Sequence, residues 1–162
     1  MPKPRRTDPA PPVRTPSQDG PLGILSPLNH RPAFLARLAQ LRAFDQFHRH
    51  FAGLGVTPAG FSVFALVATN PGVRPGAIAE ELRIKSSNLA ALVNALVAEG
   101  LVQRTPDATE LRANLLHVTE AGARAWREME RAADEVDAGF LDGLTPAEGR
   151  QLVALLRKLL HR

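Results

Sequence analysis

The segment from Ser86 to Glu99 is apolar along one side and small and polar along the other. Its apolar residues recur at spacings of three and four, as on one face of a helix: Leu89, Leu92, Val93, Leu96 and Val97. At about 100° per residue, the opposite face holds Ser87, Asn88, Ala91, Asn94, Ala95 and Ala98. Hydroxyl and amide groups on such a face can hydrogen-bond to base edges in a major groove, and asparagine can pair bidentately with adenine.

The residues before this segment predict a helix-turn-helix. Pro75 opens a short helix through Leu82, because proline is well tolerated in a first helical turn. Residues 83–85 form a tight connection, Ser86 is expected to cap the second helix, and Gly100 is expected to end it. One face of the second helix can then seat on the body while the other enters a groove.

A hairpin is expected directly after the second helix. Two strand candidates, 101–105 and 114–118, are separated by turn residues around Pro106. A further helix with Thr57 as N-cap precedes the helix-turn-helix. The order predicts a winged helix-turn-helix lobe over residues 56–118.

Long amphipathic helices flank this lobe. Residues 33–54 predict one such helix, and residues 119–162 predict two, the last opened by a capping box from Thr145 to Glu148. A monomer of this size would struggle to cover both apolar stripes, so we expect 33–54 and 119–162 to be the dimerisation helices of a homodimer. The predicted fold class is mainly α with a small β-hairpin wing.

Composition limits the kind of protein. A hydrophobic fraction of 44% in 162 residues allows one packed domain. Cysteine is absent, which excludes disulfides and thiol chemistry. No secretory signal and no apolar run of membrane-spanning length are found, so we expect a cytoplasmic protein without a membrane contact.

The first 32 residues differ from the rest. Residues 1–32 hold 9 of the 14 prolines, with five basic and two acidic residues, and predict a Pro-rich, largely disordered basic tail. This tail could contact phosphate or a partner loosely, or it could be a solubilising leader. The domain over 33–162 is almost neutral, so any nucleic-acid surface in it must be local.

The central region resembles the MarR family of regulators. The resemblance depends on the order and spacing of four motifs: Thr57–Phe61, Gly100–Arg104, Asp107–Ala113 and Val118–Gly122. It implies a sequence-specific DNA-binding regulator, typically a homodimeric repressor of a catabolic, biosynthetic or efflux operon. Such a repressor leaves a pseudo-palindromic double-stranded DNA operator when a small aromatic or phenolic acid binds.

The chain departs from the family pattern in its cations. Its wing reads Glu110-Leu111-Arg112 and lacks one arginine, and no basic residue stands at Ser86, Ala91 or Ala95. Fewer cations release fewer counterions, so the salt dependence of DNA binding should be shallow. The DNA contacts are predicted to be Lys85, Ser86, Ser87, Asn88, Ala91, Asn94, Arg104 and Arg112.

Several of these assignments have structural alternatives. Arg112 could reach the minor groove, or could pair with Asp107 or Glu110, or both. Asn88 could cap the start of its helix, and Arg104 could be a surface strand residue. For the whole chain, the alternative is a winged-helix protein-interaction module or a regulator without a small-molecule inducer.

The resemblance also implies a ligand pocket where the dimer helices meet the lobe. His48 is expected near the middle of the apolar face of 33–54, where an imidazole among phenylalanines could bind a carboxylate or phenolate. Alternatively, His48 is a core or interface residue with a backbone partner. The predicted ligand-binding residues are His48, Arg49, Phe51, Phe61 and Phe64.

Enzyme and metal sites are not predicted. The sequence has no glycine-rich phosphate loop and no His-Glu-x-x-His. His48 and His50 are two residues apart on a helix, so they point to opposite faces and make no metal pair. We therefore expect no catalytic residue, no metal and no cofactor.

Overall fold

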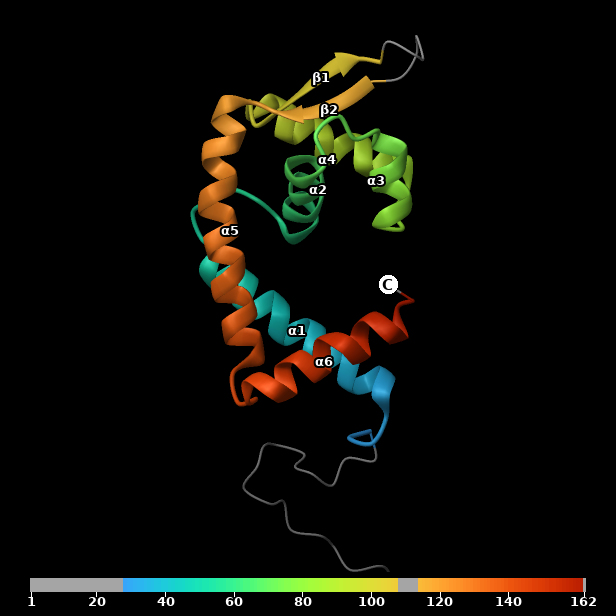
Figure 1. The fold of residues 1–162 in the computed structure, drawn as a ribbon, viewed down its shortest axis with the longest axis vertical. Coiled ribbons are helices and arrows are strands. Elements are labelled where there is room, and N and C mark those ends of the chain that lie inside the picture. The colour runs from blue at the N-terminus through green and yellow to red at the C-terminus, as the bar shows by residue number, and fades with distance from the viewer. Residues whose placement is uncertain (1–27, 108–113, 162) are drawn as a thin grey trace, which may run out of the picture. The chain divides into compact units, whose positions relative to one another are not determined.

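The computed structural model describes residues 28–107 and 114–161. Residues 1–27 of the predicted tail over 1–32, and the wing residues Glu110 and Arg112, lie outside the described residues. Within these ranges the elements are α1 (Pro32–His50), α2 (Pro58–Thr69), α3 (Pro75–Glu81), α4 (Ser86–Ala98), β1 (Val102–Pro106), β2 (Asn114–Val118), α5 (Glu120–Leu141) and α6 (Pro146–Leu159) (Figure 1). This order confirms the predicted fold class, a mainly helical chain with one small hairpin.

The chain divides into two compact units, residues 1–40 and 41–162. In the smaller unit, α1 begins at Pro32 after a turn at 28–30. The larger unit contains the last turns of α1 and all the other elements. None of the helices in the described parts of the chain is long and apolar enough to cross a membrane.

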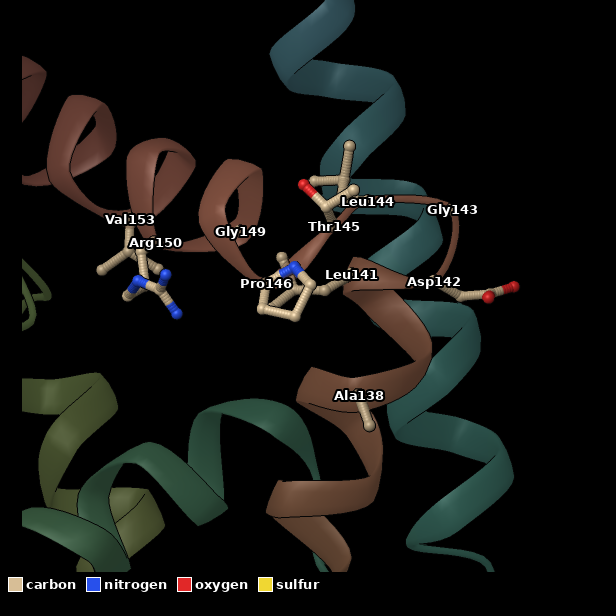
Figure 2. A pocket seen from close by; sticks show the side chains of 10 residues that line it. All are labelled: Ala138, Leu141, Asp142, Gly143, Leu144, Thr145, Pro146, Gly149, Arg150 and Val153. Atoms are coloured by element: carbon tan, nitrogen blue, oxygen red, sulfur yellow. The ribbon is translucent and has the colours of Figure 1, made fainter.

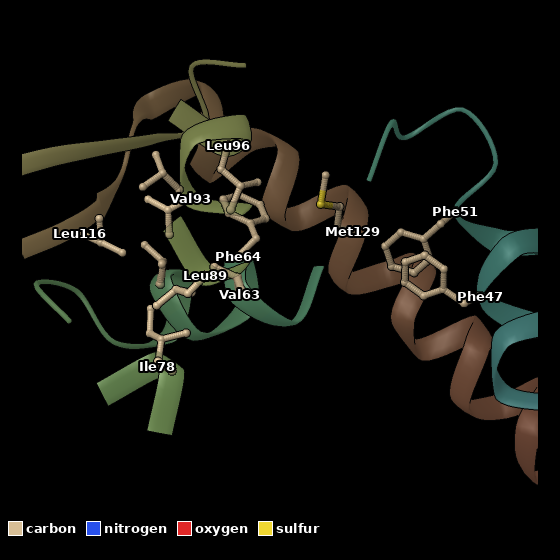
Figure 3. Close-up of a cluster of buried hydrophobic side chains, with 13 residues drawn as sticks. Phe47, Phe51, Val63, Phe64, Ile78, Leu89, Val93, Leu96, Leu116 and Met129 are labelled. Atoms are coloured by element: carbon tan, nitrogen blue, oxygen red, sulfur yellow. The ribbon is translucent and has the colours of Figure 1, made fainter. Parts of the chain in front are cut away.

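The core of the larger unit lies between α2, α3, α4 and the hairpin. The face of α4 predicted to be apolar is buried there, with Leu89 and Val93 each 2% exposed. Figure 3 shows these side chains packed against α2 and the strands. The largest fully buried side chains of the chain's described residues are all in this core: Phe64, Ile78, Leu89, Leu116, Val63, Val67, Val93 and Val102.

The hairpin is attached to the start of α3. Strands β1 and β2 pair antiparallel in a register that runs from Val102↔Val118 to Pro106↔Asn114. Leu116 also bridges to Val73, whose carbonyl accepts a 3.0 Å hydrogen bond from the Leu116 amide. The first strand begins at Val102, one residue later than predicted.

An ion pair joins the base of the wing to the same segment. Arg74 Nη2 lies 2.6 Å from Asp107 Oδ2, and the Asp107 side chain is 7% exposed while that of Arg74 is 50% exposed. Arg74 occupies the N-cap position of α3, and Asp107 follows β1 directly. The pair therefore holds the end of β1 against the start of α3.

Local capping chemistry starts three of the helices as predicted. Thr57 and Thr119 each accept a hydrogen bond from the amide three residues on, and Thr145 forms a complete capping box with Glu148. The hydrogen bonds from the backbone and hydroxyl of Thr145 lower the pKa of Glu148. Since its folded pKa is depressed, Glu148 contributes stability above its ordinary pKa and loses that contribution as the pH falls.

Helix α4 corrects one prediction. Its first helical residue is Ser86, so the N-cap position belongs to Lys85, which makes no side-chain capping hydrogen bond. Arg83 in the preceding connection has a φ of 52°, in the left-handed region. After this tight turn the helix begins at Ser86, one residue earlier than a serine cap at that position would place it.

Helix α5 begins in direct contact with the end of α4. The hydroxyl of Thr119 donates to the carbonyl of Gly100 at 2.6 Å and accepts from the amide of Gly122 at 2.9 Å. A Cβ on Gly122 would overlap the carbonyl oxygen of Leu101. The start of α5 can approach the α4–β1 turn this closely only because residue 122 has no side chain.

The end of α5 is joined to the part of α1 that lies in the larger unit. Arg42 donates from Nη2 to the carbonyls of Gly139 and Asp142, at 3.0 and 2.9 Å. These carbonyls belong to the last turn of α5 and its C-cap, where helix carbonyls lack partners and a cation is favoured by the helix dipole. Gly139 also leaves room for the side chain of Gln46.

We predict that Gly122→Ala lowers the free energy of unfolding by about 3 kcal/mol, because the new methyl group would overlap the Leu101 carbonyl. Urea unfolding measures the change. Gly76→Ala is the matched control, since it lies in a helix and its Cβ would meet nothing within 4 Å. On helix propensity alone both changes should stabilise, so an unaltered midpoint for Gly122→Ala would contradict the proposed close contact.

We predict that Arg74→Met lowers the free energy of unfolding by about 1 kcal/mol, because it removes a charge-assisted hydrogen bond to a buried carboxylate. The value is modest since Arg74 is half exposed and the pair is screened by solvent. Arg124→Met, on an exposed position of α5, is the control. Equal urea midpoints for the two variants would show that the pair does not stabilise the wing base.

Candidate nucleic-acid interface and ligand site

The predicted contact residues of α4 share its exposed face. Leu89, Val93 and Leu96 turn inward, and the opposite side is small and polar. Lys85 at the helix start is also exposed. The exposed predicted contacts on the helix are Ser86, Ser87, Asn88, Ala91 and Asn94.

The start of α4 suits a phosphate group. Its first-turn amides have no side-chain cap from Lys85, which is an exposed cation at the N-cap position. Amides at a helix start together with the helix dipole favour an anion. Arg83, which the sequence analysis did not select, is a second exposed cation in this connection.

Arg104 and Asn94 contact each other across two elements. Arg104 is on β1 and Asn94 is on α4, and Arg104 Nη2 donates to Asn94 Oδ1 at 2.7 Å in an exposed position. Arg104 also borders a hollow of about 140 Å³ between α3 and α4, which Ser86 and Ala90 line from the helix. Sequence spacing had suggested these two residues as separate contacts, and the structure joins them.

One acidic partner suggested for Arg112, Asp107, pairs with Arg74 at the base of the wing. The two residues are 33 positions apart and no motif links them. Arg112 itself, the predicted wing contact, is outside the described residues.

The nominated phenylalanines form an aromatic cluster with two residues that the sequence analysis missed. Phe51 stacks on Phe47 with ring centroids 4.0 Å apart, and it also meets Phe61 edge-on at 4.9 Å. Phe61 in turn stacks at 6.0 Å on Trp126, which also contacts Phe64. Figure 3 shows Phe47 and Phe51 side by side. Phe61 and Trp126 are half-buried, whereas Phe51 and Phe64 are core residues.

His48 does not lie among the buried phenylalanines. It is exposed, as is Arg49, and the buried position on this turn of α1 belongs to Phe47. His48 instead shares a face with Leu41 and Phe44, which are 45% and 40% exposed. Among the residues that the structure describes, nothing covers this part of the predicted apolar face.

A larger hollow lies at the turn between α5 and α6. Its volume is about 480 Å³, and aliphatic side chains including Leu141, Leu144 and Val153 line it, with Arg150 beside them (Figure 2). None of the nominated ligand residues borders it. Leu144 and Val153 are also more than 40% exposed.

The acidic residues of α5 do not form a metal-binding group in the ranges that the structure describes. Partial burial raises the pKa of Asp137, and the nearby charge of Asp134 adds to this effect. No group of three or more histidine, aspartate or glutamate side chains there could hold a metal ion.

Known proteins resemble this chain in sequence and fold. Residues 54–113 match the model of the MarR family. A protein of Thauera aromatica, a candidate transcriptional regulator of the hcr operon, is 34% identical over 127 residues, which span 78% of this chain and 76% of that protein.

Two solved structures carry the comparison further. The transcriptional repressor CouR, bound to a 23-mer DNA duplex, is 30% identical with a TM-score of 0.76, and the match covers 82% of this chain and 94% of CouR. The PcaV regulator of Streptomyces coelicolor, in complex with its natural ligand, is 25% identical with a TM-score of 0.72 over 83% of this chain and 94% of PcaV. The chain therefore belongs to the MarR family of winged-helix transcriptional regulators, and it is a regulator rather than an enzyme.

Proposed function

We propose that the chain is a homodimeric repressor that binds a pseudo-palindromic DNA operator and is released by a small aromatic or phenolic acid. The observation that carries the proposal is the exposed, small and polar face of α4 beside the hairpin of a MarR-family lobe. CouR, a relative with 30% identity, is a repressor solved on DNA. The protein is expected to act in the cytoplasm, where its operator lies.

The contacts divide by chemistry. The hydroxyl and amide groups of Ser87, Asn88 and Asn94 are suited to base edges, and Ser86 and Ala91 leave room for the groove wall. The cations Lys85, Arg104 and Arg112 are suited to phosphate oxygens, which position the protein and carry no sequence information. Because α4 itself contains no lysine or arginine, the specific part of the affinity depends on its polar side chains.

The dimer proposal depends on apolar surface that is exposed among the residues the structure describes. Helix α6 exposes Leu155, Leu156 and Leu159 at 56, 39 and 70%, and its C-cap residue Leu160 is 51% exposed. The hollow at the α5–α6 turn adds the exposed apolar side chains of Leu144 and Val153. A contiguous exposed patch of this kind marks an interface, and a two-fold dimer can place two α4 helices one DNA turn apart, about 34 Å.

The ligand proposal places an aromatic acid at the half-buried rings of Phe61 and Trp126. Aromatic faces can stack on a ligand ring, and His48 or Arg49 could pair with its carboxylate. PcaV, which is 25% identical, was solved with its natural ligand. A ligand that binds better to a dimer with a different lobe separation lowers the DNA affinity by its preference for that state.

The second candidate is a protein-docking module or a regulator without a small-molecule inducer. The absence of basic residues from α4 favours it, because phosphate contacts supply much of the affinity of DNA-binding helices.

We predict that Leu156→Asp shifts the protein from dimer to monomer in analytical ultracentrifugation, because a carboxylate would be buried in the apolar interface. Ala154→Asp is the matched control, since it adds the same charge on the opposite side of α6. A monomeric wild-type protein, or equal masses for the two variants, would contradict the proposed interface.

We predict that the full chain enriches an inverted repeat from a library of duplexes with randomised base pairs, and that two chains bind each selected duplex. An aromatic acid from a panel should then release the DNA and change the fluorescence of Trp126, the sole tryptophan. Failure to enrich any sequence at low salt would favour the docking module. Enrichment without an effect of any acid would favour a regulator lacking such an inducer.

A further inference from the structure

The contact between Arg104 and Asn94 fixes the direction of an amide that faces the proposed groove. Asn94 lies on the outward side of α4, about 140° from Leu89 around the helix axis. Arg104 reaches it from β1, and the two side chains meet at 2.7 Å in an exposed position. A side chain of the hairpin therefore directly restrains a side chain of the recognition helix.

The chemistry of arginine decides which end of the amide it holds. A guanidinium has five donors and no acceptor, so only the carbonyl oxygen of an asparagine can face it. Arg104 thus turns Oδ1 of Asn94 toward the hairpin. The amino group Nδ2, which is a donor, is left for a base.

This orientation opposes the usual pairing of asparagine with adenine. That pairing needs Oδ1 to accept from the adenine N6 amino group while Nδ2 donates to N7. Because Arg104 already donates to Oδ1, the adenine N6 amino group would have to approach the same oxygen next to the N–H donors of a cation. Guanine N7 and O6 and thymine O4 are acceptors that meet no such conflict, whereas adenine presents its N7 acceptor only with the N6 donor beside it.

We propose that Arg104 is a positioning residue that leaves Asn94 only its Nδ2 donor for contact with a base. One position of each half-site then prefers guanine or thymine, whose acceptors Nδ2 can reach without conflict, over adenine. The proposal rests on the proposed DNA-binding function. It adds a base preference at Asn94 and a role for Arg104 besides contact with phosphate.

The test compares the sequences that variants select from a randomised duplex library at about 50 mM salt. Wild type should prefer guanine or thymine at one position of each half-site by about tenfold, the discrimination expected of one good base contact. Asn94→Ala should lose this preference and leave the other positions unchanged. Asn94→Asp still accepts from Arg104 but presents an acceptor to the base, so the preference should change to cytosine or adenine, which offer amino groups.

Variants of Arg104 test the positioning role. Arg104→Lys keeps a donor-only cation and should keep the preference, whereas Arg104→Met should lose it at the same position as Asn94→Ala. The salt dependence separates positioning of Asn94 from contact with phosphate. Loss of a phosphate contact lowers the slope of log binding constant against log salt concentration by about one, and it weakens binding to all sequences alike. Gln103→Ala, a neighbouring exposed residue of β1, is the control and should select the wild-type sequence.

Each outcome decides the proposal. If wild type enriches a sequence but Asn94→Ala and Arg104→Met select the same base at every position, the inference is overturned and the proposed function stands. An adenine preference at the position that depends on Asn94 would also overturn it. If wild type enriches nothing, the proposed function fails and this inference fails with it.

Discussion

The close packing of Gly122 against the carbonyl of Leu101 is the constraint on which the rest of the structure depends. With the two hydrogen bonds of Thr119, it fixes the start of α5 to the turn that ends α4. The other end of α5 is held by Arg42, and the aromatic cluster around Trp126 lies between these two ends. In the proposed mechanism, a ligand at the aromatic cluster would act on α4 through α5. The contact of Gly122 with Leu101 leaves α5 little freedom to move without the end of α4.

Features that depend on neighbouring residues could be predicted from the sequence. Three helices are capped by a threonine hydroxyl that accepts from the amide three residues on, at Thr57, Thr119 and Thr145. This spacing can be recognised in the sequence. The buried face of α4 follows from the helical period, and so does the exposed face with Asn94. The order of these local signals was sufficient for the winged-helix fold and for the resemblance to the MarR family.

Features that depend on distant residues could not be predicted in this way. Arg74 pairs with Asp107 across 33 positions, and Arg104 pairs with Asn94 because the hairpin folds back on α4. The period of helix α1 predicts one apolar face with His48 near its middle, but the residue that packs against Phe61 and is buried is Phe47. Hydrophobic spacing alone did not show which side of the helix the tertiary contacts would cover.

The central claim is that the exposed face of α4 enters the major groove. Dimethyl sulfate protection on the selected duplex tests it directly, because the N7 atom of guanine lies in that groove. The account predicts protected guanines in two clusters whose centres are one helical turn, about 34 Å, apart. A saturating concentration of protein that leaves every N7 atom as reactive as in free DNA would contradict it.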